Sequence, residues 1–576
     1  MPSSIDLDQR SSNDSQANEP TIYVSKESNN QYSENFETRF EMFRFTILIT
    51  GICLAMFMMS LNSTLVAPAM GIIATQLNAT ENQTWIATAY LVAINAFQPL
   101  SGKFSDIFGR KAVFLFAIAT FFIGSIISAV ANSINILIAG RVIQGFGGGG
   151  VMSMTYITVT DVTPVLLRPR FQSILGVVYG IASVVGPLIG NDIKEPRAFS
   201  KTNIFFSFLG GAFVDHASWH WDFWLNVILS GIAFVIIFIF LKSPKNVAQE
   251  SFIHKLKRID YLGTLFATGF VVCLLLALSW GNSYGWNDGH CIGSFVASGV
   301  SFIALVYVEG WVAKEPLLPA QILLNPACTT AYLYMIFLGL TFICTLYFGP
   351  VYFQAVFGAD STQSGLRLIP FMVCLIAASV GGGILIQIFP YPKYFIIFAG
   401  ASNLICYGLF QLVNPSSNWG QQAGFLAFGG LAFGLSNQNA IFTVQSSVAL
   451  KDIAVATTCV NFFMMLSSSV GVCIYQTLSA TFVKAQYAGL PAEVLKVANE
   501  YGALKNYLFI RKMPLEYQQP MTHAYAAAMH NLFIIPLVAA GLGLVVAIFF
   551  KPVRYGGSPA AASTKQEIDI EKESVV

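Results

Sequence analysis

The chain has 576 residues, of which 55% are hydrophobic and only 10% are charged, and its mean hydropathy is +0.63. A soluble domain carries roughly a quarter charged residues, so this deficit excludes an ordinary soluble protein. The formal net charge of +2 also argues against a nucleic-acid partner. The cysteines form no Cys-x-x-Cys pair and most lie in apolar runs, which favours buried apolar side chains over a metal site or a disulfide framework.

Apolar runs that are long enough to span a bilayer recur along the chain. A hydrocarbon core about 30 Å thick takes roughly 20 residues of helix, and a lipid-exposed backbone must satisfy its own hydrogen bonds, so helices are predicted and not strands. The fold class is therefore an all-α polytopic membrane protein. About fourteen transmembrane helices are expected, near 46–66, 84–101, 112–131, 134–157, 171–190, 222–241, 261–280, 291–313, 332–356, 366–388, 395–413, 423–443, 456–480 and 526–550.

The distribution of basic residues predicts the orientation. With the amino terminus in the cytoplasm, the short inside loops carry most lysines and arginines, while the outside loops 67–83, 281–290 and 414–422 carry none. Both tails, 1–43 and 553–576, are then cytoplasmic, and the polar composition of the first predicts disorder. The long loop 481–525 is expected outside.

The loop between the second and third runs carries Gly102, Asp106, Gly109, Arg110 and Lys111. Two glycines would let the backbone reverse in a tight turn, and the carboxylate can face the two cations or a helix N-terminus. A basic stop-transfer loop is the alternative. The spacing resembles the signature loop of the major facilitator superfamily, which latches neighbouring helices in one access state. The resemblance implies that the acid and its arginine gate the conformational change without touching substrate.

The fourth run contains Arg141, Gln144 and a glycine-rich stretch at 145–150. An arginine at bilayer depth is costly and marks a functional site by default, and glycines permit close helix approach or local bending. An arginine that snorkels to the membrane surface is the alternative. The stretch is similar to the span-4 motif of the same superfamily, so the resemblance implies a role for Arg141 in proton coupling.

The fifth run carries Gly176, Gly180, Gly186, Pro187 and Gly190. Small residues four apart make a groove for a facing helix, and the proline is expected to kink the span. The pattern resembles the motif of the antiporter branches of the superfamily, although alanine occupies position 182 where glycine is usual.

Residues 191–210 interrupt this motif. In the family the Gly-Pro pair is followed by two residues and then two adjacent glycines, and removal of 191–210 brings Gly211 directly after Gly190. Codons for this stretch can hold a splice donor, a branch point, a pyrimidine-rich tract and an acceptor. We therefore hypothesise a translated, unspliced intron, with a genuine family-specific outside loop as the alternative.

An acidic residue that could carry a proton is hard to find in the apolar runs. The stretch around Asn62 resembles a span-1 motif of the fourteen-span drug:proton antiporter branch, in which an acid is usual at this position. Asparagine can hydrogen-bond a ligand but cannot carry a proton. Asp161, Asp222 and Glu309 lie at the ends of their runs and are interpreted as boundary residues.

Several polar side chains inside the apolar runs are candidates for lining a substrate cavity. The alternative is that they form helix–helix hydrogen bonds, worth about 1 kcal/mol each in membranes. No phosphate-binding loop and no metalloprotease motif occurs, so neither an enzyme nor an ATP-driven pump is expected, and no cofactor or metal. The cavity candidates are Asn62, Tyr90, Asn95, Gln98, Gln144, Gln354, Gln438 and Asn461.

The resemblance implies a major facilitator fold with two six-helix bundles, at 44–241 and 314–552, joined by a linker with two additional helices at 242–313. It implies a monomeric exporter of amphipathic small molecules, such as drugs, toxins or secondary metabolites, that exchanges them for protons by alternating access around a midplane cavity. The plasma membrane is the expected location, with the vacuolar membrane as the alternative. The rival function is an importer or facilitator of a small organic solute such as an iron chelate or an amine.

Sequencing of transcripts across the codons for 191–210 tests the intron hypothesis. We expect the dominant messages to lack these codons, because their loss restores the glycine pair at 190 and 211. Dominant, translated messages that keep the whole stretch would remove the hypothesis and leave an outside loop.

Overall fold

The computed structural model describes residues 39–77, 79, 83–164, 167–192, 219–242, 252–313, 315–359, 361–504 and 507–555, and these residues contain helices and no strand. Residues 193–210 of the suspected insertion and most of both predicted tails lie outside this set. Residues 39–43 are helical, so the predicted disordered tail is too long at its end. The apolar character starts a few residues after the helix does, which explains the difference.

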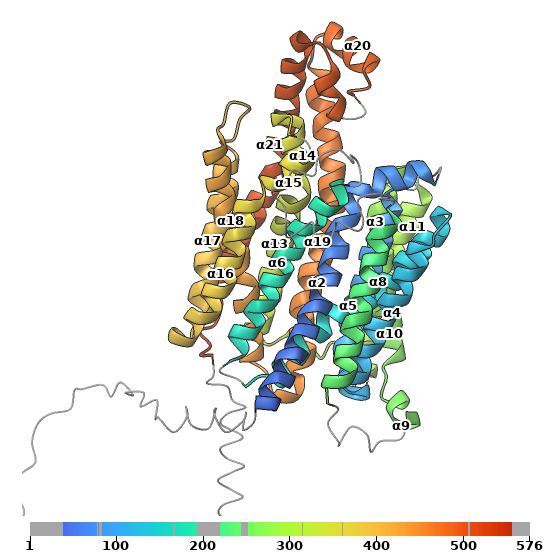
Figure 1. The fold of residues 1–576 in the computed structure, drawn as a ribbon, viewed down its shortest axis with the longest axis vertical. Helices are drawn as coiled ribbons and strands as arrows, with labels where there is room; N and C mark the ends of the chain where they lie inside the picture. Colours follow the sequence, from blue (N-terminus) through green and yellow to red (C-terminus); the bar gives the residue numbers. More distant parts are fainter. Residues whose placement is uncertain are drawn as a thin grey trace, which may run out of the picture. The chain divides into compact units, whose positions relative to one another are not determined.

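The first six long helices coincide with the first six predicted spans (Figure 1). They are α2 (Arg39–Gln76), α3 (Gln83–Phe108), α4 (Arg110–Ala129), α5 (Ile134–Val162), α6 (Arg168–Asp192) and α8 (His220–Phe240). We refer to the part of this group from Leu48 onward as the first half, and Leu48 is where a compact unit that extends to the end of the chain begins.

A pair of long helices follows the first half, after the short α9 (Phe252–Lys257). The pair consists of α10 (Tyr261–Tyr284) and α11 (Gly289–Tyr307), which ends in a π-helical turn, η4 (Val308–Val312). These helices pack against each other, and α10 also packs against α3. They correspond to the two additional helices of the predicted linker.

The second half begins after the short α12 (Ala320–Leu323) and holds the remaining predicted spans. Its elements are α13 (Pro326–Ile343), η5 (Cys344–Phe348), α14 (Gly349–Phe357), α15 (Ser361–Leu366), α16 (Ile369–Ile388), α17 (Pro392–Phe410), α18 (Trp419–Gln445), η6 (Leu450–Asp452), α19 (Ile453–Ala488), α20 (Ala492–Glu500), η7 (Tyr507–Lys512) and α21 (Leu515–Ile548).

The long loop predicted at 481–525 is largely helical. α19 continues past 480 and α21 begins before 526, and α20 and η7 lie between them. Hydropathy ends a predicted span where polar residues begin, but a helix does not need an apolar sequence to continue once its packing is favourable. α19 and α21 pack against each other.

Ten segments of the described residues are both long and apolar enough to cross a membrane. Four further helices of comparable length, α3, α5, α6 and α18, have less apolar sequences. These four carry glycine and buried amide side chains, and in a membrane such residues face other helices and not lipid. The total of fourteen spans stays a prediction.

The most extensive contacts between the two halves lie along two pairs of helices. α3 packs against α19, and α6 packs against α16. Within the first half, α5 packs against both α3 and α4, and within the second half α18 packs against α16 and α17. α10 reaches α19 as well as α3, so the additional pair lies beside one of the two contacts between the halves.

The glycine-rich stretch of α5 brings three helices close together. A Cβ atom at Gly147 would lie 2.6 Å from the Ala117 carbonyl oxygen of α4, and one at Gly149 would lie 2.5 Å from the Ile94 carbonyl oxygen of α3. Real Cβ atoms do not approach a backbone this closely, so α5 can pack here only without side chains. The predicted close helix approach is confirmed at these positions.

Replacement of Gly147 by alanine tests this packing. We expect a loss of about 1–3 kcal/mol of stability, because the methyl group meets backbone atoms of α4 that cannot move aside. Thermal melting of the detergent-solubilised protein measures the effect. Gly408→Ala is the matched control, since a Cβ atom there meets nothing within 4 Å. Equal melting temperatures for the two variants would contradict the tight α4–α5 contact.

Candidate functional site

Arg141 is buried in the first half, with 2% of its surface exposed. Its Nε donates to the Ile86 carbonyl oxygen at 3.0 Å, and its Nη1 donates to Asn62 Oδ1 at 3.0 Å and to Gln144 Oε1 at 2.8 Å. The guanidinium lies over the Tyr90 ring, 4.2 Å from its centroid. This burial contradicts the snorkelling alternative, which requires a charged group in contact with the surface.

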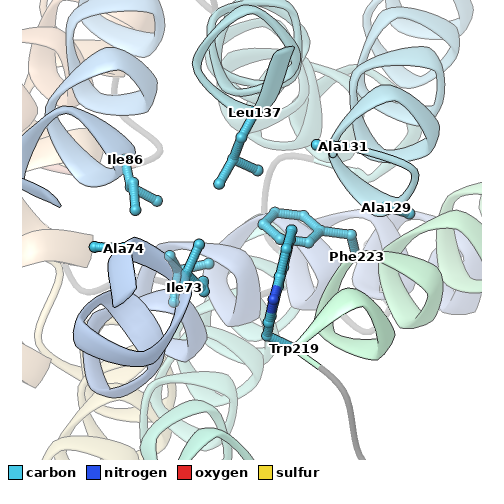
Figure 2. Close-up of a cluster of buried hydrophobic side chains, with 9 residues drawn as sticks. Ile73, Ala74, Ile86, Ala129, Ala131, Leu137, Trp219 and Phe223 are labelled. Atoms are coloured by element: carbon cyan, nitrogen blue, oxygen red, sulfur yellow. The ribbon is translucent and has the colours of Figure 1, made fainter. Parts of the chain in front are cut away.

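An apolar cluster closes one side of the Arg141 site. Figure 2 shows the rings of Trp219, which directly precedes α8, and of Phe223 in α8 among Ile86 and Leu137, which come from the beginnings of α3 and α5. The Phe223 centroid lies 5.9 Å from the guanidinium carbon. Water is therefore kept from this face of the cation, which strengthens its hydrogen bonds with the amide oxygens.

The partners of Arg141 are neutral. Among the described residues, the hydrogen bonds of Arg141 end on amide and carbonyl oxygens, and Arg141 forms no ion pair there. Asn62 Oδ1 also accepts from Asn226 Nδ2 at 3.3 Å, so one amide oxygen joins α5 to α2 and α8. Gln144 in turn donates to Ser125 Oγ of α4 at 2.8 Å. A single side-chain network thus connects α2, α4, α5 and α8.

The loop between α3 and α4 forms a compact ionic cluster. Arg110 donates to Asp106 Oδ1 at 2.5 Å and to Asp161 Oδ2 at 2.8 Å, which ties the ends of α3 and α5 to the start of α4. Lys111 Nζ donates instead to the Phe238 carbonyl oxygen at 2.6 Å, near the end of α8. The predicted contact between Asp106 and Arg110 is confirmed, and Asp161 is a third member that the sequence did not reveal.

The two glycines of this loop have different roles. Gly109 lies between α3 and α4 with a φ of 93°, a conformation that favours glycine, and it makes the predicted turn. Gly102 is inside α3, and a Cβ atom there would lie 2.8 Å from Thr458 Oγ1 of α19. The expectation that Gly102 also serves the turn is wrong, because it serves the close contact between the halves.

A second ionic cluster attaches the additional helices. Glu315 pairs with Lys103 of α3 at 3.0 Å and with Arg258, which precedes α10, at 2.9 Å. Partial burial alone would raise the pKa of the Glu315 carboxyl, but hydrogen bonds from Arg258 and Lys103 outweigh it, and the pKa is lowered. The carboxylate therefore stays charged at neutral pH.

Neutral side chains join the two halves at the end where the α3–α4 loop lies. Gln172 Nε2 of α6 donates to Thr160 Oγ1 at 2.9 Å and to Gln445 Oε1 of α18 at 3.4 Å. Gln445 Nε2 donates to Thr160 Oγ1 at 3.1 Å and to Thr457 Oγ1 of α19 at 3.2 Å. We call Thr160, Gln172, Gln445 and Thr457 the amide gate. It holds the halves together at this end.

A small cavity lies between the halves, away from the amide gate. Its volume is about 10 Å³, and its lining includes Tyr156 and Tyr179 of the first half and Ser379, Phe433 and Asn437 of the second. This volume holds about one water molecule. This cavity is too small for an amphipathic solute.

A larger cavity, of about 670 Å³, lies between α14, the last turns of α19 and the segment from α20 to α21. Its lining includes Phe348, Lys484 and three tyrosines, Tyr487, Tyr507 and Tyr525. It belongs to the helical segment that the sequence suggested to be an outside loop.

Comparisons with known proteins decide the family. The sequence model of the Major Facilitator Superfamily matches residues 52–191 and 198–472. The chain belongs to this superfamily. It is therefore an integral, multi-pass membrane transporter of small molecules and not an enzyme, and the predicted all-α major facilitator fold is confirmed. Residues 192–197, between the matched segments, lie within the suspected insertion.

Curated fungal relatives resemble the chain along most of its length. An efflux pump of the major facilitator type from Arthroderma benhamiae is 30% identical over 532 residues, which are 91% of this chain and 94% of the pump. The aspyridones efflux protein of Neocamarosporium betae is 30% identical, with 87% of this chain and 86% of that protein covered. An efflux pump of Aspergillus niger is 31% identical over 76% of this chain and 79% of its own.

Solved structures of distant members share the fold. The inward-facing, occupied structure of a bacterial homologue of the lysosomal transporter Spinster has a TM-score of 0.53 and 12% identity, and it covers 89% of this chain and 99% of its own. The human organic anion transporter TETRAN has a TM-score of 0.51 and 13% identity, with 86% and 99% covered.

Five of the eight predicted cavity residues form two groups in the structure. Asn62, Tyr90 and Gln144 surround Arg141 inside the first half. Asn95 and Gln438 cross between the halves, with Asn95 Nδ2 donating to Ser469 Oγ at 2.8 Å and Gln438 Nε2 donating to the Gln172 carbonyl oxygen at 2.9 Å.

The remaining candidates behave differently. Asn461 donates to the Thr457 carbonyl oxygen of its own helix, and Gln354 bonds to Ser364 and Tyr507 near the larger cavity. Gln98 is fully buried, and neither atom of its side-chain amide has a partner in the described part of the chain. Cavity lining stays a prediction for all of them.

The glycines of the fifth span face the second half. A Cβ atom at Gly176 would lie 3.1 Å from Ser379 Oγ, and one at Gly180 would lie 3.2 Å from Leu375, both on α16. This is the groove for a facing helix that the sequence predicts. Gly186, Pro187 and Gly190 belong to α6, but their side-chain surroundings, and hence the predicted kink, lie outside what the structure describes.

Asp106→Asn tests the ionic cluster as a gate. A charge-assisted hydrogen bond is worth about 1.5 kcal/mol or more, so its loss should slow turnover roughly tenfold. The order in which different dyes are transported should not change, because the loop lies outside the cavity. Glu500→Gln, at an exposed position on α20, is the isosteric control and should transport at the wild-type rate. An altered order of preferred dyes in Asp106→Asn would contradict a pure gating role.

Proposed function

We propose that this chain exports amphipathic small molecules, such as drugs, toxins or secondary metabolites, in exchange for protons. The proposal places it as a monomer in the plasma membrane, working by alternating access of the two halves. The main support for this proposal is the buried hydrogen-bond network of Arg141, in a chain whose curated relatives are efflux pumps.

Export is supported by the relatives and by the fifth span. The names of the relatives describe efflux pumps, and one of them describes efflux of aspyridones. The Gly176 and Gly180 positions, which resemble the antiporter motif, lie at the contact with α16. The substrate of this chain would be an amphipathic small molecule that need not share the structure of aspyridones.

The chemistry around the small cavity supports an amphipathic and largely uncharged substrate. The lining contains no charged side chain, and it places aromatic rings such as Tyr179 and Phe433 beside the amide of Asn437. Asn437 Oδ1 and both amide atoms of Gln98 are buried without partners in the described residues. Buried polar groups are normally hydrogen-bonded, so these atoms are suited to receive polar groups of a substrate or water when the halves separate.

Alternating access would proceed through the amide gate. Opening at this end replaces the neutral hydrogen bonds of Gln172 and Gln445 with bonds to water, and each such exchange costs only about 1 kcal/mol. The Asp106–Arg110–Asp161 cluster stays within the first half, so it can keep the ends of α3, α4 and α5 together as a rigid unit.

Proton coupling would use the charge of Arg141. A buried cation between helices responds strongly to any change of charge nearby, because the surroundings screen it poorly. A proton that arrives at or leaves this network changes the hydrogen bonds that join α2, α4, α5 and α8. The rival, a facilitator without proton coupling, is favoured by one observation, the neutral Asn62 in the position where an acid is usual.

Efflux of preloaded dyes from pump-deficient yeast tests the proposal. Cells expressing the chain, with and without 191–210, are loaded with rhodamine 6G or Nile red and followed with and without a protonophore. We expect efflux that collapses with the protonophore, and Arg141→Ala should lower it at least about tenfold, which corresponds to roughly 1.4 kcal/mol in the barrier.

Controls separate the alternatives. Arg141→Lys keeps the positive charge but cannot reproduce the separate hydrogen bonds of Nε and Nη1. We therefore expect it to retain part of the activity. Surface labelling confirms that each variant reaches the membrane. Efflux that a protonophore does not affect would favour the facilitator, and normal proton-dependent efflux by Arg141→Ala would refute the coupling role.

A further inference from the structure

Asp222 is a buried acid near the Arg141 site. It lies in the first turn of α8, its exposed fraction is 2%, and its Oδ2 has no hydrogen-bond partner in the described part of the chain. The sequence suggested a boundary residue, and the structure places Asp222 at the start of α8, where its side chain is buried.

Hydrogen bonds connect the backbone of Asp222 to the Arg141 site. Asn226, one turn after Asp222, donates through Nδ2 to the Asp222 carbonyl oxygen at 2.9 Å and to Asn62 Oδ1 at 3.3 Å. Asn62 Oδ1 is the same atom that accepts from Arg141. Phe223, the residue after Asp222, lies against the guanidinium. A movement of the first turn of α8 therefore changes the surroundings of Arg141 directly.

We propose that Asp222 is the proton-carrying acid of this transporter and takes the role for which span 1, with Asn62, has no carboxyl group. The inference rests on the proposed proton exchange. The acid binds one proton on a carboxylate oxygen from the aqueous phase on one side, and releases the same proton to the other side while one substrate molecule moves in the opposite direction.

The charge balance of the site supports this assignment. A carboxylate with a buried oxygen that lacks a partner is costly, which favours the protonated form of Asp222, and the hydrogen bonds of Arg141 end on neutral oxygens. When the proton leaves, the new negative charge lies in the first turn of α8, one turn before Asn226, which bonds to the Asn62 oxygen that Arg141 also uses. We expect this charge to shift the first turn of α8, and such a shift changes the bonds that join α8, α2 and α5.

Few other groups could titrate at this end of the first half. Among the described side chains, the charged or titratable groups of this site are Arg141 of α5, Tyr90 of α3 and His220 of α8 itself. α2 and α4 contribute none at this end. Arg141 and Tyr90 do not change charge near neutral pH, and His220 is only half-buried on the first turn.

The structural alternative is that Asp222 stabilises the start of α8. An acid in the first turn interacts favourably with the helix dipole, and this needs no proton transfer. The two roles predict different results when the acid is moved to another helix. An acid placed on α2 beside Arg141 could take over proton transport from Asp222, but it could not stabilise the start of α8.

The experiment uses the full-length chain in vesicles with rhodamine 6G as the probe. Asp222→Asn should lose roughly tenfold or more of the protonophore-sensitive accumulation, a loss within the usual range of coupling between sites. It should retain exchange of the dye between the two sides in the absence of a proton gradient. The double variant Asn62→Asp with Asp222→Asn should regain gradient-driven accumulation, and Asp222→Glu should keep it.

The outcomes are distinct. Gradient-driven accumulation that persists in Asp222→Asn overturns the inference, and so does a loss of both activities that Asn62→Asp fails to restore. A wild-type chain without protonophore sensitivity overturns the proposed proton exchange itself. In that case infrared spectroscopy still tests Asp222 alone. The band of its protonated carboxyl group must be present in the wild-type protein and absent from Asp222→Asn. A band that the substitution leaves unchanged overturns the assignment.

Discussion

A guanidinium buried without a carboxylate partner is the constraint on which the first half depends. An isolated charge in a helix bundle is tolerated only where polar groups surround it, and Nε and Nη1 of Arg141 donate to oxygens from α2, α3 and its own helix. Each of these oxygens is in place only when the helices have the observed separation. The helix packing and the charge therefore depend on each other, and neither can change alone.

The close packing of α5 makes this network achievable. Glycines at 145, 147 and 149 allow the backbones of α3 and α4 to approach, which brings Tyr90 and Ser125 within reach of Arg141 and Gln144. Side chains at these positions would push the helices apart and leave buried donors without acceptors. The glycine stretch and the arginine, two separate features of the sequence, thus serve one structural purpose.

The sequence predicted the helical fold, the major facilitator family and the positions of the long helices, because apolar runs of bilayer length leave few alternatives. It also predicted the pairing of Asp106 with Arg110, which are four residues apart on the two sides of the Gly109 turn. It could not predict the amide gate, since Gln172 and Gln445 meet only through the three-dimensional arrangement of the halves. Gly102 was misread because a glycine near a turn and a glycine in a close helix contact give the same sequence pattern.

The least apolar helices show where the molecule must move. α3, α5, α6 and α18 fall short of the apolarity of a typical span, and all four take part in the contacts between the halves. Lipid does not satisfy amide and hydroxyl groups, so these surfaces must face protein or water at every stage of a transport cycle. When the halves separate, water and substrate replace the partner helix, and the polar side chains remain satisfied. An interface that opens during transport therefore requires helices of low hydropathy such as these four. A permanent contact between the halves could consist of apolar side chains alone.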